Sequence, residues 1–214
     1  MQRTLRMNFE KGVGMLVFWK PKLVFLATPK TGTTAIETSL ESLAALSIPR
    51  PPPLKHTSVQ RYHRFLRPFL EDAADGPFSV VALIREPRDW LGSWYRYRQR
   101  DGIGNPKKST RDISFDEFVQ AYCRPDRPEF ANVGSQARFL KKSDGRWVDR
   151  LFRYEDIDSF VHFLEDKLNC EILLPRLNVS PPGSLDLTAK TEALLHSFAA
   201  KDFAMYRTLQ PGDD

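Results

Sequence analysis

The chain has 214 residues, of which 41% are hydrophobic and 12% aromatic, so it can bury the core of a globular domain. Its formal net charge of +5 favours anionic partners, without choosing among nucleotides, acidic glycans, nucleic acids and phospholipid surfaces. No apolar run reaches the ~20 residues of a membrane span, and residues 1–11 lack the apolar core of a signal peptide, so we expect no membrane insertion and cytoplasmic residence. Cys123 and Cys170 lie far apart without metal-ligand spacing, which indicates neither a disulfide framework nor a zinc site.

Strand and helix patterns alternate through the first half of the chain. Residues 23–27 are an apolar run that predicts a first strand, and residues 35–46 place apolar side chains at helical spacing. The almost unbroken, β-branched run at residues 78–84 predicts a central parallel strand that is covered on both faces. Residues 86–100 then predict a second helix.

The second half continues this alternation. A third strand is predicted at residues 147–152, a helix at 157–168, a short fourth strand at 171–174 and a terminal helix at 188–209. Residues 49–57 and 101–113 look like loop insertions. No internal repeat or linker is found, so we predict a single domain over residues 1–214.

Repeated strand, loop and helix units imply right-handed crossovers and a parallel sheet with helices on both faces. We therefore predict an α/β fold with a central parallel sheet. Ligands of such sheets bind at the carboxyl ends of the strands.

The turn after the first predicted strand, residues 29–34, reads PKTGTT and is typical of an anion-binding turn. Gly32 permits a tight turn, the first amides of the following helix offer free N–H groups, and the helix dipole adds partial positive charge. Lys30 adds a full charge, and Thr31, Thr33 and Thr34 add hydroxyl donors. The expected ligand is a phosphate or sulfate group, and the alternative is an ordinary turn with a threonine N-cap.

A second constellation follows the 78–84 strand, where residues 85–95 read REPRDWLGSWY. The guanidinium of Arg85 and the hydroxyl of Ser93, two helical turns on, are suited to grip one phosphate. The alternative is that Arg85 pairs with Glu86 or Asp89 in an exposed turn.

Together these two segments resemble the cofactor signatures of the sulfotransferases that use 3'-phosphoadenosine 5'-phosphosulfate (PAPS). Residues 29–34 resemble that family's PKSGTT loop for the 5'-phosphosulfate, with Thr31 in place of serine. Arg85 and Ser93 match in type and spacing the pair that binds the 3'-phosphate. Tyr154, in the RYED segment after the third predicted strand, resembles the tyrosine that contacts adenine. The resemblance covers about residues 23–180.

The chain also departs from the pattern of many cytosolic members of that family. Ala35 stands where they carry a tryptophan that stacks on adenine, and their C-terminal RKG element is missing. Residues 174–180 instead resemble small bacterial and carbohydrate-type branches. The resemblance therefore implies a small-molecule or carbohydrate acceptor rather than a steroid or phenol.

The resemblance further implies a three-layer architecture like that of P-loop NTPases and in-line transfer of a sulfuryl group, leaving 3',5'-bisphosphoadenosine (PAP). Lys30 would stabilise the charge that develops on the leaving oxygen, as in phosphoryl transfer. Residues 31–34 would hold the 5'-phosphate, while Arg85 and Ser93 would hold the 3'-phosphate. The scheme requires no metal ion.

The acceptor must lose a proton, and a histidine is the usual base. We predict His56, which follows the proline-rich stretch in a region from which similar bacterial sulfotransferases present a Lys-His segment. His63 is the reserve and Glu37 a weaker alternative. His162 and His196 fall within predicted amphipathic helices, where a packed or surface role is expected.

Two other functions are compatible with these patterns. A nucleotide kinase shares the strand, anion turn and helix, but here the lysine precedes the glycine and no GxxxxGK[ST] motif is present. A nonenzymatic basic module could bind nucleic acid or acidic glycan through residues 61–67 and 96–100, where arginines and aromatics interleave. The sulfotransferase prediction includes no nucleic-acid partner.

Overall fold

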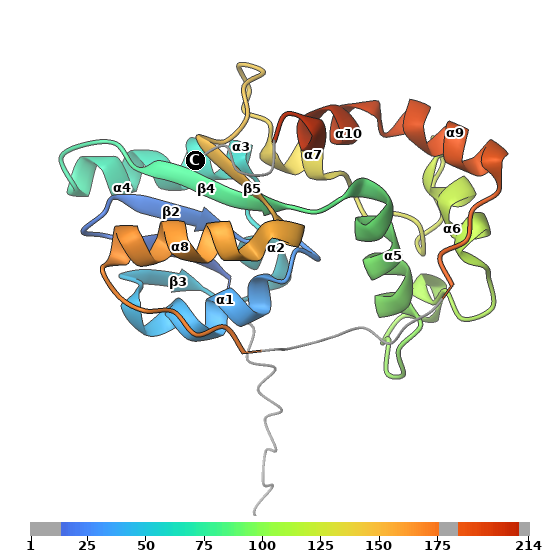
Figure 1. Cartoon of the computed structure of the whole chain (residues 1–214), viewed down its shortest axis with the longest axis horizontal. Coiled ribbons are helices and arrows are strands. Elements are labelled where there is room, and N and C mark those ends of the chain that lie inside the picture. Colours follow the sequence, from blue (N-terminus) through green and yellow to red (C-terminus); the bar gives the residue numbers. More distant parts are fainter. Residues whose placement is uncertain (1–13, 176–183, 210–214) are drawn as a thin grey trace, which may run out of the picture.

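The computed structural model describes residues 14–175 and 184–209 (Figure 1). In this part of the chain, five strands form one sheet in the order β3-β1-β2-β4-β5. β2, β4 and β5 are parallel neighbours, whereas β1 runs antiparallel to both β2 and β3. The strand bounds are Met15–Phe18 (β1), Leu23–Leu26 (β2), Leu46–Ile48 (β3), Ser79–Ile84 (β4) and Arg150–Arg153 (β5).

The α/β class is confirmed, but the prediction of a parallel sheet is wrong on one side, because the sheet is mixed. β1 leads into β2 through a tight turn in which the Lys22 amide donates to the Trp19 carbonyl at 3.1 Å, so β1 and β2 form a hairpin rather than a crossover. β1 and β3 were not among the predicted strands. Each is only three or four residues long, too short for a distinct period.

The predicted strand at residues 171–174 is also wrong. The Ile172 amide donates to the Glu165 carboxylate at 2.8 Å, so a side chain rather than a neighbouring strand satisfies it. Ile172 is buried while Leu173 is 80% exposed. The apolar pattern therefore reflects one buried anchor in an irregular segment.

The described helices are more numerous and shorter than predicted. The predicted helix at 35–46 ends at Leu40 and gives way to a 3₁₀ turn, Glu41–Leu43, because Leu46 pairs with Val17 in the sheet. The predicted terminal helix divides at Ala199. The helix bounds are Thr33–Leu40 (α1), Pro52–Lys55 (α2), Val59–Arg61 (α3), Tyr62–Leu66 (η2, a π-helix), Arg67–Ala73 (α4), Pro87–Arg98 (α5), Phe115–Tyr122 (α6), Gln136–Leu140 (α7), Ile157–Leu168 (α8), Ala189–Phe198 (α9) and Ala200–Arg207 (α10).

Side chains alternate between two cores on opposite faces of the sheet. Leu23 and Phe25 of β2 lie in the core that α1 and α8 cover, whereas Val24 and Leu26 lie in the core that α3, α4, α7 and α10 cover. β4 is buried throughout residues 80–84, as its unbroken apolar sequence predicts. These layers hold the carboxyl ends of β2, β4 and β5 side by side.

A third hydrophobic cluster lies beyond those strand ends, where α5, α6 and α9 pack together (Figure 1). Trp90, Phe118 and Leu195 are among its buried members. The cluster fixes α5, which starts directly after β4, against the rest of the fold.

No helix in the described residues is long and apolar enough to cross a membrane. The prediction for residues 1–11 lies outside the described part of the chain.

Candidate anion site at the carboxyl ends of the parallel strands

Two backbone carbonyls of the segment between β2 and α1 accept hydrogen bonds from side chains. The Trp90 indole donates to the Pro29 carbonyl at 2.8 Å, and the Thr31 hydroxyl donates to the Thr28 carbonyl at 3.0 Å. Lys30 and Gly32 both have left-handed backbone conformations, with φ of 66° and 68°. One contact from α5 and one bond within the turn therefore stabilise this backbone shape.

This shape decides which groups of the predicted turn remain available. α1 begins at Thr33, whose side chain is buried, as is that of Thr31. The hydroxyl of Thr31 is used inside the turn, so the prediction that it serves as a ligand donor does not fit this geometry. The first backbone amides of α1 have no acceptor within the helix, as at any helix start, and Thr34 is only partly buried.

Lys30 lies in a cationic and aromatic environment on the side of α5. Its Nζ is 3.8 Å from the ring centroid of Tyr97 and 5.3 Å from that of Trp94. Burial, followed by the charges of nearby arginines, lowers the pKa of Lys30 to about 7; these arginines are Arg100, Arg85, Arg96 and Arg98. The charged ammonium is therefore poorly compensated by the protein itself, and an anion beside it would restore its ordinary charge.

Arg85 links the β4 end to the turn. One guanidinium nitrogen donates to the Lys30 carbonyl at 3.3 Å, and two others contact the Asp89 carboxylate at 2.6 Å. The alternative pairing with Asp89 is thus present. Asp89 also lies 3.6 Å from Arg96, so this carboxylate keeps a cationic neighbour if Arg85 turns toward a ligand.

Tyr154, which directly follows β5, contacts both of the other segments. Its ring centroid is 4.5 Å from the guanidinium carbon of Arg85. A Cβ placed on Gly32 would lie 2.5 Å from the Tyr154 ring, so only glycine allows the ring to approach the turn. Lys30, Gly32, Arg85 and Tyr154, from three separate strand ends, therefore meet at one place.

Ser93 lies in the second turn of α5 and is only 6% exposed. No hydrogen bond joins the two described side chains of Ser93 and Arg85. The structure places both on one segment but does not join them in a phosphate grip.

His56 is anchored to the end of β2. Its Nδ1 lies 2.8 Å from the Ala27 carbonyl, which can only accept, so Nδ1 carries the proton and Nε2 keeps its lone pair. Burial lowers the pKa of His56 below its ordinary value, and the charges of Lys55 and Lys30 add to this effect. The imidazole is therefore neutral near pH 7, with the tautomer that a base requires.

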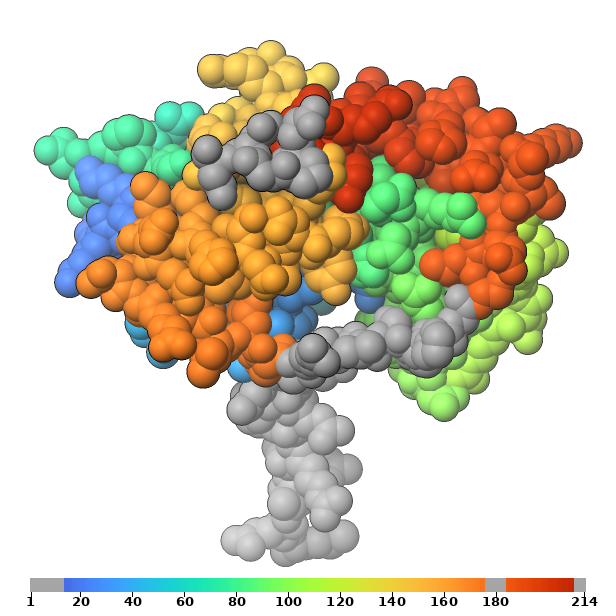
Figure 2. Space-filling view, in the orientation of Figure 1, coloured from blue at the N-terminus to red at the C-terminus, as the bar shows by residue number. Residues whose placement is uncertain are grey.

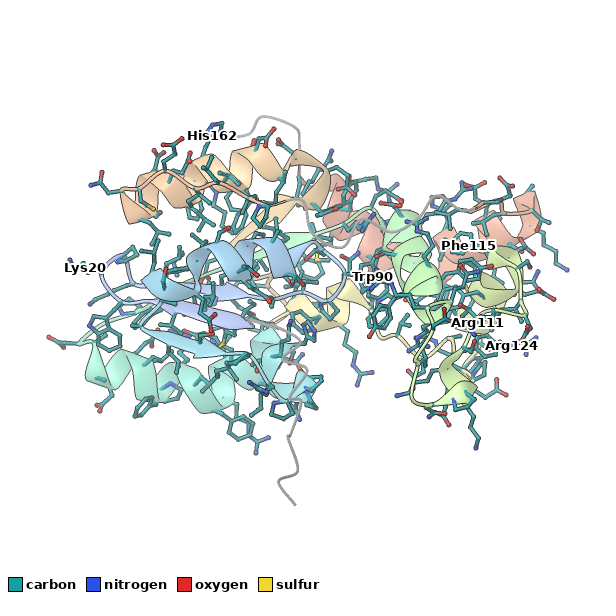
Figure 3. The ribbon with its side chains drawn as sticks, turned by 90° about the horizontal axis from the view of Figure 1, so that it is seen from below. Lys20, Trp90, Arg111, Phe115, Arg124 and His162 are labelled. Atoms are coloured by element: carbon teal, nitrogen blue, oxygen red, sulfur yellow. The ribbon has the colours of Figure 1, made fainter. Side chains whose placement is uncertain are left out.

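The other predicted bases lie in different settings. His63 contacts Arg67 at the far side of the fold, and His196 stacks on Phe203 with ring centroids 4.2 Å apart. His162 is exposed on α8, far from Trp90 (Figure 3). Glu37 of α1 is fully buried, 3.2 Å from Lys55, and burial raises its pKa to about 7.

Gln136, which the sequence pattern did not indicate, also orders this edge of the sheet. Gln136 of α7 is buried and bonds both backbone groups of Arg85, accepting from its amide at 2.9 Å and donating to its carbonyl at 2.8 Å. It acts as a substitute strand partner at the end of β4. The 51 residues that separate the two in sequence leave no local signal.

The view in Figure 2 shows the surface hollowed between α1 and α8 on one side and α5 on the other. Within the described residues, no three His, Cys, Asp or Glu side chains gather as a metal ion would need. Residues 176–180, part of the segment that resembles the carbohydrate-type branch, lie outside the described residues.

Comparison with models of known protein families and with curated proteins finds no match to this chain.

Proposed function

We propose that this protein transfers a sulfuryl group from PAPS to a hydroxyl or amine of a small-molecule or carbohydrate acceptor. The supporting observation is that Lys30, Arg85 and Tyr154, from the ends of three adjacent parallel strands, meet at one edge of the sheet. These are the residue types that the sequence resemblance assigns to the two phosphate groups and the adenine.

The charge distribution at this edge fits a ligand with several negative charges. Burial and then the charges of four arginines lower the pKa of Lys30, and Asp89 is the carboxylate that pairs with two of these arginines, Arg85 and Arg96. Positive charge thus exceeds negative charge around the turn. A nucleotide with 3'- and 5'-phosphate groups would offset this excess.

The proposed contacts follow from this geometry. The backbone amides of residues 31–34 and the hydroxyl of Thr34 would hold the 5'-phosphate at the start of α1. Arg85 would leave Asp89 and bind the 3'-phosphate. Ser93 of α5 would be the second residue that binds this phosphate. Tyr154 would contact the adenine, because its ring lies next to both Gly32 and Arg85.

When bound, PAPS supplies an activated sulfuryl group, and its transfer leaves negative charge on the bridging oxygen of the nucleotide. Lys30 would stabilise that charge in its protonated form. Without a ligand, the ammonium of Lys30 makes cation–π contacts with the rings of Tyr97 and Trp94. A bound anion would compete with these rings for the ammonium. Catalysis by Lys30 is therefore electrostatic.

His56 would take the acceptor proton at Nε2. The Ala27 carbonyl fixes the imidazole through Nδ1, so the ring orientation is set by the same strand end that starts the anion turn. Lys55, which directly precedes His56, pairs with the buried Glu37 of α1 at 3.2 Å.

Two measurements on the full chain test the proposal. PAP should raise the melting temperature in the absence of metal, whereas ATP with magnesium should have a smaller effect. Radiolabelled sulfate from PAPS should then appear in a component of a metabolite extract. Stabilisation by ATP with magnesium but not by PAP would support a nucleotide kinase instead.

Lys30→Ala is the sharpest variant for the transfer assay, with Lys20→Ala as its matched control. Lys20 is exposed in the turn before β2, far from Trp90 (Figure 3). Transfer should fall about 100-fold or more in Lys30→Ala and stay unchanged in Lys20→Ala. Turnover near that of the unmodified protein in Lys30→Ala would contradict the proposed role.

A further inference from the structure

A cavity of about 510 Å³ opens at the amino ends of the parallel strands. Lys22 immediately precedes β2, Ser79 begins β4 and Asp149 immediately precedes β5, and all three line it. In Figure 3, Lys20 marks this end of the sheet and Trp90 marks the opposite end, where the candidate anion site lies. The two sites are thus separated by the length of the strands.

Cationic side chains from three separate segments line this cavity. Lys22 comes from the turn before β2, Arg67 begins α4, and Lys142 and Arg146 come from the turn that the Lys141–Trp147 bridge closes. Asp149 is the acidic residue among the lining side chains. The lining itself is therefore strongly positive.

The carboxylates near these cations compensate them only in part. Asp149 is fully engaged, because one oxygen pairs with Lys142 at 2.5 Å and the other accepts from the Val80 amide at 2.8 Å. Glu71 pairs with Arg67 at 2.9 Å.

The other two cations are held more loosely. Asp144 pairs with Arg146 at 2.8 Å, while the Arg146 side chain is 79% exposed. Lys22 donates to a backbone carbonyl, that of Asp75, at 3.2 Å. Lys22 and Arg146 can therefore turn toward a ligand without leaving a buried carboxylate unpaired.

His63 adds a hydrogen-bond donor without an acceptor. A guanidinium nitrogen of Arg67 lies 3.0 Å from His63 Nδ1 and can only donate, so Nδ1 accepts and the proton lies on Nε2. That Nε2 atom is buried and has no hydrogen-bond partner. An unpaired buried donor is costly, and an oxygen of a bound ligand would satisfy it.

The apolar part of the lining indicates more than a bare ion. Pro21, Pro77 and Phe78 line the cavity beside the charged groups, and Phe78 packs against Trp19 with ring centroids 5.7 Å apart. The volume also lies within the range of small-molecule sites.

We propose that this cavity binds a small organic anion through a phosphate or sulfate group. The charged group would contact Lys22, Arg146 and the Nε2 proton of His63, and the apolar part would lie on Phe78 and the two prolines. The proposal does not depend on the proposed transferase activity, because it uses none of the same residues.

Phenyl phosphate and phenyl sulfate test the proposal by calorimetric titration of the full chain, with phenol as the uncharged probe. We expect at least one of the esters to bind and phenol not to bind. Preference for phenyl phosphate would assign a phosphorylated ligand, and preference for phenyl sulfate a sulfated one. Phenol binding as tightly as the esters would overturn the proposal.

Four variants locate the bound ester. Affinity should fall about tenfold or more in Lys22→Ala/Arg146→Ala and in His63→Phe, which keeps a ring but removes the donor. It should be unchanged in Lys108→Ala, an exposed cation elsewhere, and in Arg85→Ala at the other end of the sheet. Arg146→Ala alone, at an exposed position, provides the test if the other variants do not fold.

Three results with the variants would also overturn the proposal. Unchanged affinity in the Lys22 and Arg146 variants would show that the cavity is not the binding site. Loss in Arg85→Ala alone would place the ester beside Lys30. Equal losses in Lys108→Ala and the cavity variants would indicate nonspecific attraction to a basic protein.

Discussion

Lys30 combines, in one residue, a strained backbone, an aromatic neighbour and a depressed pKa. Its φ is 66°, and its side chain reaches α5, where Tyr97 and Trp94 contact it and four arginines oppose its charge. A lysine with a pKa of about 7 is only half protonated at neutral pH. Anion binding must therefore be coupled to proton uptake.

We predict that PAP binding takes up about one proton per site at pH 8, where the phosphate groups of free PAP are already ionised. The sign follows because the bound anion raises the pKa of Lys30, so the complex holds a proton that the free protein has lost above pH 7. Affinity should accordingly fall as the pH rises above 7. Calorimetric titration in buffers of different ionisation enthalpy measures the uptake. Lys30→Arg should abolish the uptake, since arginine stays charged, and uptake that persists in this variant would assign it to another group.

His56 is distinguished from the other histidines by one hydrogen bond, the one to the Ala27 carbonyl. We predict that His56→Ala lowers kcat for sulfuryl transfer by about 10²- to 10⁴-fold, while the affinity for PAP changes less than about twofold. His162→Ala, on the exposed side of α8, is the matched control and should leave both unchanged. In the unmodified protein, the acidic limb of the pH–rate profile should have its midpoint below 6.5, because burial lowers the pKa of His56. A wild-type rate in His56→Ala would move the base elsewhere.

At the scale of elements, the site depends on how three strand ends approach one another. Gly32 occupies the centre of this approach, with a left-handed φ and the Tyr154 ring where a Cβ would lie. The buried amide of Gln136 fixes the end of β4 in the same region. These contacts are long-range in sequence, and they set how the β2–α1 turn, the end of β4 and Tyr154 lie relative to one another.

We predict that Gly32→Ala lowers the affinity for PAP more than about tenfold and destabilises the fold by about 1–3 kcal/mol, because the added methyl group meets both a disfavoured φ and the Tyr154 ring. Gly104→Ala is the matched control, since nothing lies within 4 Å of the position that a Cβ would take there and its φ is not positive. Titration with PAP and thermal unfolding of both variants give the comparison. Equal affinities in the two variants would show that the turn tolerates a side chain.

At the scale of the whole molecule, one mixed sheet separates two cores and carries the two proposed sites at its opposite ends. The carboxyl ends of β2, β4 and β5 carry the Lys30 site, and their amino ends carry the cavity of Lys22 and His63. The cluster of α5, α6 and α9 extends the fold beyond the carboxyl ends. Both sites depend on the central strands staying aligned.

We predict that Phe25→Ala, in the centre of the sheet, destabilises the protein by about 3–5 kcal/mol. Phe25 is fully buried and its ring centroid is 5.4 Å from that of Phe160 on α8. Phe69→Ala is the control, because Phe69 is 70% exposed on α4 and should change stability by less than about 0.5 kcal/mol. Denaturant unfolding measures both, and similar losses in the two variants would contradict this packing.

The local sequence determined the features that depend on neighbouring residues alone. Apolar periodicity predicts the strands β2 and β4 and the helices α5 and α8. Glycine and proline, which favour turns, predict the turn after β2. The candidate anion turn could be located for the same reason, since Gly32 and the start of α1 are adjacent in the chain.

Only the tertiary structure decided the antiparallel β1, the irregular course of residues 171–175 and the final partners of the site residues. Arg85 pairs with Asp89, the hydroxyl of Thr31 turns inward, and Gln136 and Tyr97 enter the site from distant segments. Each of these partners is chosen when the layers pack, because several donors, acceptors and charges then lie within reach of the same group. The competing groups come from segments far apart in sequence, so a local sequence pattern cannot predict which of them pairs.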